Sequence, residues 1–149
     1  DPHGKNIMRR MPRNPKEKIV DANMTLSIIV IGIMIAVGVL WLFNYGLQTS
    51  AILGQTMAFV SLVVFEIVRI YMIRSNYKIG VFSNKWLLLA ILSSLGLQML
   101  VVYTPLNKVF KVIPLGWLEG GYIIGATIIL FIIGLIANKI IQKITHEMD

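Results

Sequence analysis

Two side chains that can take part in chemistry lie inside one long apolar segment of the sequence. Residues 50–74 read SAILGQTMAFVSLVVFEIVRIYMIR, and they contain Glu66 and, three positions later, Arg69. A helix of about 20 apolar residues crosses the ~30 Å hydrocarbon core of a bilayer. Glu66 lies eight residues before Arg74, which places it about 12 Å from that end of the helix. A charged side chain at this depth costs roughly 2.5–3.5 kcal/mol on insertion scales, so Glu66 is a candidate functional residue.

The polar groups of this segment share one face if the segment is helical. At about 100° per residue, Gln55, Glu66 and Arg69 point the same way, opposite a valine-rich side. Glu66 and Arg69 are three positions apart, so their side chains can touch. Two other interpretations stay open: the pair is a purely structural ion pair, or Arg69 reaches toward the membrane interface.

The composition of the whole chain indicates a membrane protein. Hydrophobic residues make up 56% of the 149 residues and charged residues 14%, with a mean hydropathy of +0.76. Soluble domains carry about 25% charged residues. The absence of cysteine excludes disulfides, thiolate metal sites and thiol nucleophiles within this sequence.

The apolar segments define the expected fold class and domains. We expect an all-α membrane protein with a basic cytoplasmic loop or tail at residues 1–23 and a transmembrane domain at residues 24–149. Its four transmembrane helices are expected at about residues 26–43, 50–74, 86–103 and 117–141.

The polar residues within the helices and the link at residues 104–115 have expected structural roles. Ser93, Ser94 and Gln98 are expected to hydrogen-bond across helices. Residues 104–115 contain two prolines and are too short to cross. We expect this link to lie at the interface, with its apolar side chains Val109, Phe110 and Val112 in lipid or packed on the bundle.

The distribution of positive charge predicts the orientation. Of the 14 lysine and arginine residues, 12 fall in the two termini and the middle loop region with the adjoining end of its helix. The positive-inside rule therefore places both termini in the cytoplasm of a multi-pass protein of the cell membrane. Because the net charge of +7 is explained by this orientation, nucleic acid is not an expected partner.

No motif for catalysis is visible in the chain. It contains no phosphate-binding loop of the form GxxxxGK followed by Ser or Thr, and no nucleotide-binding glycine fingerprint. We therefore do not expect this chain alone to be an enzyme. It opens on Asp-Pro-His-Gly without a methionine, and we expect it to be a fragment or a processed product.

Two stretches resemble the C-terminal part of P-type cation pumps, the calcium-pump branch in particular. Residues 7–19, IMRRMPRNPKEKI, are similar to the cytoplasmic loop between the sixth and seventh membrane helices. Residues 56–75, continuing to VFSNKWLL at residues 81–88, are similar to the eighth helix and its exit loop. A weaker match joins residues 101–115 to the link between the ninth and tenth helices.

The resemblance implies a role for Glu66 and a set of partners. Glu66 falls where the eighth helix of calcium pumps contributes an acidic cation ligand, so Ca²⁺ is the implied transported ion. The other ligands, the phosphorylated aspartate and the Mg-ATP-binding domain would belong to the parent P-type Ca²⁺-transporting ATPase. The implied partners are its remaining helices and cytoplasmic domains, together with the lipid bilayer. Arg10, Pro12 and Arg13 would lie in a loop that contacts the phosphorylation domain.

Two observations limit what this chain can bind. Calcium takes about 6–8 oxygen ligands, Glu66 supplies at most two, and Gln55 lies about three turns away. Reticulum-type pumps have Asn where this chain has Arg69, and a fixed positive charge there could replace a bound ion and lower the number carried per cycle. Arg69 and Gln55 are therefore possible modulators of the site.

Two functions from other classes remain as alternatives. A small four-helix proton-coupled antiporter would use Glu66 to bind a proton and a cation in turn. A purely structural four-helix module would use Glu66 only as the partner of Arg69.

Overall fold

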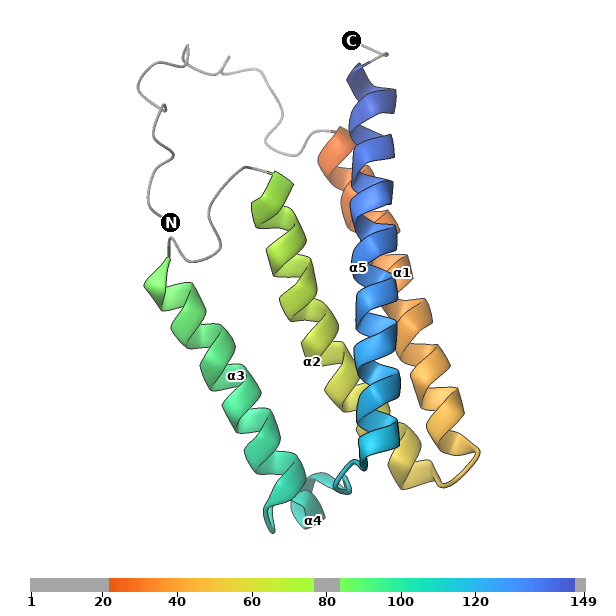
Figure 1. Ribbon diagram of the computed structural model, residues 1–149, viewed down its shortest axis with the longest axis vertical. Helices are drawn as coiled ribbons and strands as arrows, with labels where there is room; N and C mark the ends of the chain where they lie inside the picture. Colours follow the sequence, from red (N-terminus) through yellow and green to blue (C-terminus); the bar gives the residue numbers. More distant parts are fainter. Residues whose placement is uncertain (1–21, 77–83, 147–149) are drawn as a thin grey trace.

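A computed structural model describes residues 22–76 and 84–146, which are helical except for short connections (Figure 1). The helices are α1 (Ala22–Leu47), α2 (Ala51–Asn76), α3 (Lys85–Tyr103), α4 (Asn107–Phe110) and α5 (Trp117–His146). In this part of the chain, four helical stretches are long and apolar enough to cross a membrane: Thr25–Leu47, Ala51–Arg74, Lys85–Tyr103 and Trp117–Ile141. The predicted all-α fold with four membrane helices is confirmed. The described chain starts and ends at the same end of the bundle (Figure 1).

The turn between α1 and α2 is tighter than the sequence indicated. Residues 44–47, expected in a loop, continue α1, and only residues 48–50 connect the two helices. The backbone N–H groups of Thr49 and Ser50 both donate to the carbonyl oxygen of Gly46, at 3.0 Å each. The Ser50 hydroxyl accepts from the Leu53 N–H at 3.1 Å and caps α2. The turn therefore pairs the backbone N–H groups of Thr49 and Ser50 within itself.

Two glycines let the backbones of α1 and α2 touch beside this turn. A Cβ atom added to Gly46 would lie 2.7 Å from the Cα of Gly54. A Cβ atom added to Gly54 would lie 2.9 Å from the carbonyl oxygen of Phe43. Small residues at such crossings give the close packing that holds membrane helices together.

The core lies between α1, α2 and α5, while α3 stands apart from the other long helices. Figure 1 shows α3 to one side of α2, away from α1 and α5, and the Gln98 side chain of α3 donates to the Phe59 carbonyl oxygen of α2. The buried side chains of the three-helix core are Ile31, Ile35, Leu42, Leu53, Met57, Phe65, Met72, Ile123 and Leu130. The arrangement leaves one side of α2 outside this core.

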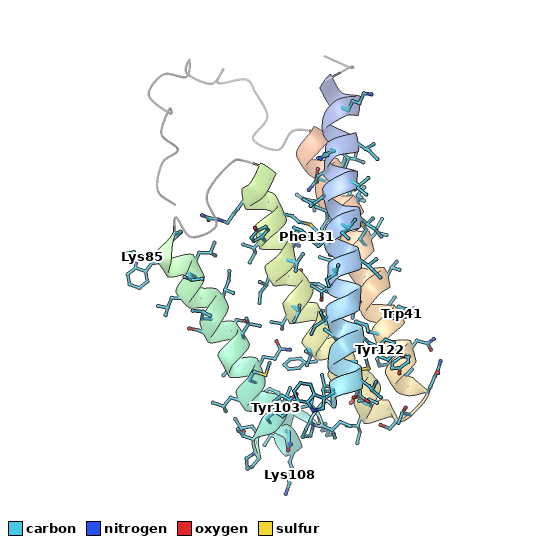
Figure 2. The ribbon with its side chains drawn as sticks, in the orientation of Figure 1. Trp41, Lys85, Tyr103, Lys108, Tyr122 and Phe131 are labelled. Carbon is cyan, nitrogen blue, oxygen red and sulfur yellow. The ribbon has the colours of Figure 1, made fainter. Side chains whose placement is uncertain are left out.

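An aromatic cluster lies near the α1–α2 turn. Tyr45 contacts Tyr122 of α5 with ring centroids 4.4 Å apart, and Trp41 stacks on Tyr45 at 6.4 Å. Figure 2 shows Trp41 and Tyr122 toward the same end of the bundle as Tyr103 and Lys108. Tyr and Trp gather at membrane–water interfaces, so this end is suited to one interface.

A side-chain hydroxyl of α2 forms a hydrogen bond with the backbone of the link between α3 and α5. The Ile113 N–H donates to the Thr56 hydroxyl oxygen at 3.0 Å, and that hydroxyl donates to the Ile52 carbonyl oxygen at 2.8 Å. Val112 is buried in the cluster that closes this end of α3, whereas Val109 and Phe110 are exposed. The expected link residues thus divide between packing on the bundle and facing outward.

We predict that Thr56→Val loosens this link. The variant removes the acceptor of the Ile113 N–H, and losing such a bond costs about 1–2 kcal/mol. The melting temperature of the purified full-length protein in detergent should fall. Thr127→Val is the matched control, because the Thr127 hydroxyl bonds only to Ile123 within its own helix. An equal change in both variants would show that the Thr56–Ile113 contact contributes nothing.

Candidate cation site on helix α2

Helix α2 has a buried face and an open face. Met57, Phe65 and Met72 are fully buried against the core with α1 and α5. The opposite face carries Glu66 and is lined by side chains that are partly or largely exposed: Gln55, Phe59, Leu62, Arg69 and Ile73. Leu62 beside Glu66 is 50% exposed, so the described helices leave the part of this face around Glu66 largely uncovered.

Glu66 and Arg69 meet on the open face, as their spacing predicts. The Arg69 Nη1 atom donates to the Glu66 Oε1 atom at 3.5 Å. Charge-assisted hydrogen bonds are usually about 2.7–2.9 Å long, so this contact is weak. The Arg69 side chain is 41% exposed and the Glu66 side chain 43%. The pair therefore does not occupy the carboxylate fully.

Glu66 lies deep within the membrane span, and this depth limits the partners that its carboxylate can have. The span Ala51–Arg74 places Glu66 about 12 Å from one end of the helix and about 22 Å from the other. A carboxylate is an oxygen ligand of the kind that calcium prefers, and a cation is the natural partner of a negative charge in hydrocarbon.

The described residues contain no cluster of the side chains that most often bind metals. No group of three His, Cys, Asp or Glu residues occurs among residues 22–76 and 84–146. Gln55 is exposed and lies about 16 Å from Glu66 along the helix, so the two do not share a site. Among the described residues, Glu66 is therefore not part of a cluster of acidic, histidine or cysteine ligands.

Other predicted polar residues have different positions. Gln98 bonds across helices as expected: its Nε2 donates to the Phe59 carbonyl oxygen at 3.5 Å, and the side chain is 6% exposed. Ser93 and Ser94 are exposed, and neither hydroxyl has a hydrogen bond within the described part of the chain, so their expected bonds across helices are not formed there. Arg10, Pro12 and Arg13 lie outside the described residues, so their contact with a phosphorylation domain stays a prediction.

Sequence reasoning missed several buried polar side chains, and Thr56 and Asn138 are two of them. Thr56 has no exposed surface and holds the α3–α5 link, and Asn138 on α5 is 3% exposed. The Asn138 Nδ2 atom has no hydrogen-bond partner among the described residues. A polar residue in an otherwise apolar span was the only available indication of either role.

The sequence family described as "Cation transporting ATPase, C-terminus" matches residues 1–140 of the chain. The chain belongs to this family. The resemblance to P-type cation pumps is thereby confirmed, and with four membrane-spanning helices this family member is a multi-pass membrane protein.

Curated relatives extend over nearly all of this cation-transporting ATPase region. The chain is 34% identical over 156 residues to "Calcium-transporting ATPase type 2C member 1" of Mus musculus, which covers 100% of the chain and 17% of that protein. It is 29% identical over 164 residues to "Calcium-transporting ATPase 1" of Bacillus cereus, covering 95% of the chain and 18% of that protein. "Probable cation-transporting ATPase F" of Mycobacterium tuberculosis is 26% identical over 122 residues, 77% of the chain and 14% of that protein.

The comparisons also show how much of each relative the chain matches. The chain spans about a sixth of the length of the curated relatives it matches. Membership in the pump family favours the pump interpretation of the chain over the small-antiporter alternative.

Proposed function

We propose that this chain is the C-terminal membrane region of a P-type ATPase that pumps cations across the cell membrane, with Ca²⁺ as the transported ion. The observation that carries the proposal is the carboxylate of Glu66, which lies inside a membrane span on a helix face that the described helices leave open. Family membership and relatives named as calcium-transporting ATPases support the choice of ion.

In this proposal the chain supplies one ligand and a framework. Glu66 gives up to two oxygens to a site that needs about 6–8, and helices of the parent pump outside this chain supply the rest. The core of α1, α2 and α5 holds α2 in place. ATP hydrolysis, with Mg-ATP, belongs to the cytoplasmic domains of the parent pump, and both termini of this region face the cytoplasm.

The proposal predicts calcium-activated transport by the full-length protein. Purified and reconstituted in vesicles, the protein should hydrolyse ATP in micromolar free calcium and take up calcium, and a calcium chelator should abolish both activities. Equal ATP hydrolysis with calcium and with chelator, or activation by a different cation alone, would contradict the proposed ion.

A further inference from the structure

The contact between Glu66 and Arg69 is weak enough for a competing cation to replace Arg69. It joins one guanidinium nitrogen to one carboxylate oxygen at 3.5 Å, although an arginine can give a carboxylate two parallel bonds. Within the part of the chain that the structure describes, neither side chain has another hydrogen bond. A competing cation therefore has to displace one long contact to reach Glu66.

The Arg69 side chain has a second favourable position, at the membrane interface, when it is not bound to Glu66. It lies five residues before Arg74, where the span ends, which is about 7.5 Å along the helix. Arginine side chains reach over such distances to bring their charge to the membrane interface. The guanidinium keeps its charge in proteins, so Arg69 is stable only when paired or at the interface.

The charges of Glu66 and Arg69 need different partners in the empty site and in the site with a bound ion. Without one, Glu66 would be an uncompensated charge in hydrocarbon, and Arg69 is its only partner among the described residues. With a divalent cation on the carboxylate, repulsion between like charges drives the guanidinium away. The site thus has two arrangements that differ in where Arg69 lies.

We propose that Arg69 is a tethered competitor of the transported cation: its guanidinium holds Glu66 in the empty site, yields to the ion, and by returning promotes ion release. This role rests on the proposed function of Glu66 as a cation ligand. It makes Arg69 a positioning residue that sets the affinity and the release rate of the site.

The test compares Arg69→Gln with Arg69→Lys in the full-length pump. With Gln, the calcium concentration that half-activates ATP hydrolysis should fall about tenfold, the effect of losing one charged competitor. Turnover at saturating calcium should also fall, because calcium leaves more slowly. The Lys variant keeps a cation and should stay close to the parent in both measurements. A purely structural role does not predict tighter activation together with slower turnover.

Two further variants make the result decisive. In the double variant Glu66→Gln/Arg69→Gln, the fall in the calcium concentration for half-activation should vanish relative to Glu66→Gln alone. No carboxylate then remains for which Arg69 and calcium can compete. Gln55→Ala, on the same helix face, should leave the calcium concentration for half-activation unchanged. Weaker or unchanged calcium activation in Arg69→Gln, or the same tightening without Glu66, would overturn the competitor role. If Glu66→Gln shifts activation while Arg69→Gln does not, only this inference fails; if Glu66→Gln shifts nothing, the proposed ligand role of Glu66 fails.

Discussion

Glu66→Gln in the full-length pump is expected to raise the calcium concentration for half-activation of ATP hydrolysis by about 30- to 100-fold. The substitution keeps the size of the side chain but removes the negative charge, and the number of charged ligands sets calcium affinity over orders of magnitude. A loss of about 2–3 kcal/mol, ordinary for a contact to a charged group, corresponds to this range. Initial rates of ATP hydrolysis over a series of buffered calcium concentrations measure the effect.

The matched control for Glu66 is the other acid among the described residues, Glu119. It lies in the first turn of α5, at the end of its span. Glu119→Gln changes the same chemical group outside the proposed site and should leave calcium activation unchanged. Equal shifts in the two variants would indicate a general effect of removing charge, and the specific role of Glu66 would have to be abandoned.

Gly54→Leu is expected to prevent the α1–α2 hairpin from closing. Even a Cβ atom at this position would lie 2.9 Å from the Phe43 carbonyl oxygen, and that atom belongs to the backbone of the neighbouring helix. Forcing atoms into a packed site costs about 1–3 kcal/mol or more, and here a whole side chain must be placed. We expect little monodisperse protein in detergent and a lower melting temperature in what is recovered.

Gly32→Leu is the control for this prediction. Gly32 also lies in a membrane span, but a Cβ atom added there meets nothing within 4 Å. This variant should be recovered in normal amounts with an unchanged melting temperature. If both variants behave alike, the close approach of Gly46 and Gly54 is not what holds the hairpin together.

The sequence predicted the features that depend on local composition. Runs of apolar residues long enough to cross a bilayer gave four helices, because hydropathy and length decide that property alone. The three-residue spacing of Glu66 and Arg69 gave their contact, because helix periodicity fixes which neighbours meet. These parts of the fold and of the site need no knowledge of tertiary structure.

Features that depend on contacts between distant residues could not be predicted in this way. The Thr56–Ile113 hydrogen bond joins residues 57 positions apart, and no local pattern relates them. The close approach of Gly46 to Gly54 of the next helix, in the part of α1 that continues through residues 44–47, is likewise a contact between two helices. The open face of α2 depends on the packing of the opposite face against α1 and α5, which no local pattern specifies.

Equilibrium binding of radioactive calcium to the full-length pump without ATP tests the central claim most directly, because it measures the site apart from turnover. The parent protein should bind calcium saturably at micromolar concentrations, and Glu66→Gln should lose that binding over the same range while Glu119→Gln keeps it. A Glu66→Gln binding curve that superimposes on that of the parent protein would contradict the account, because the carboxylate would then hold no transported ion.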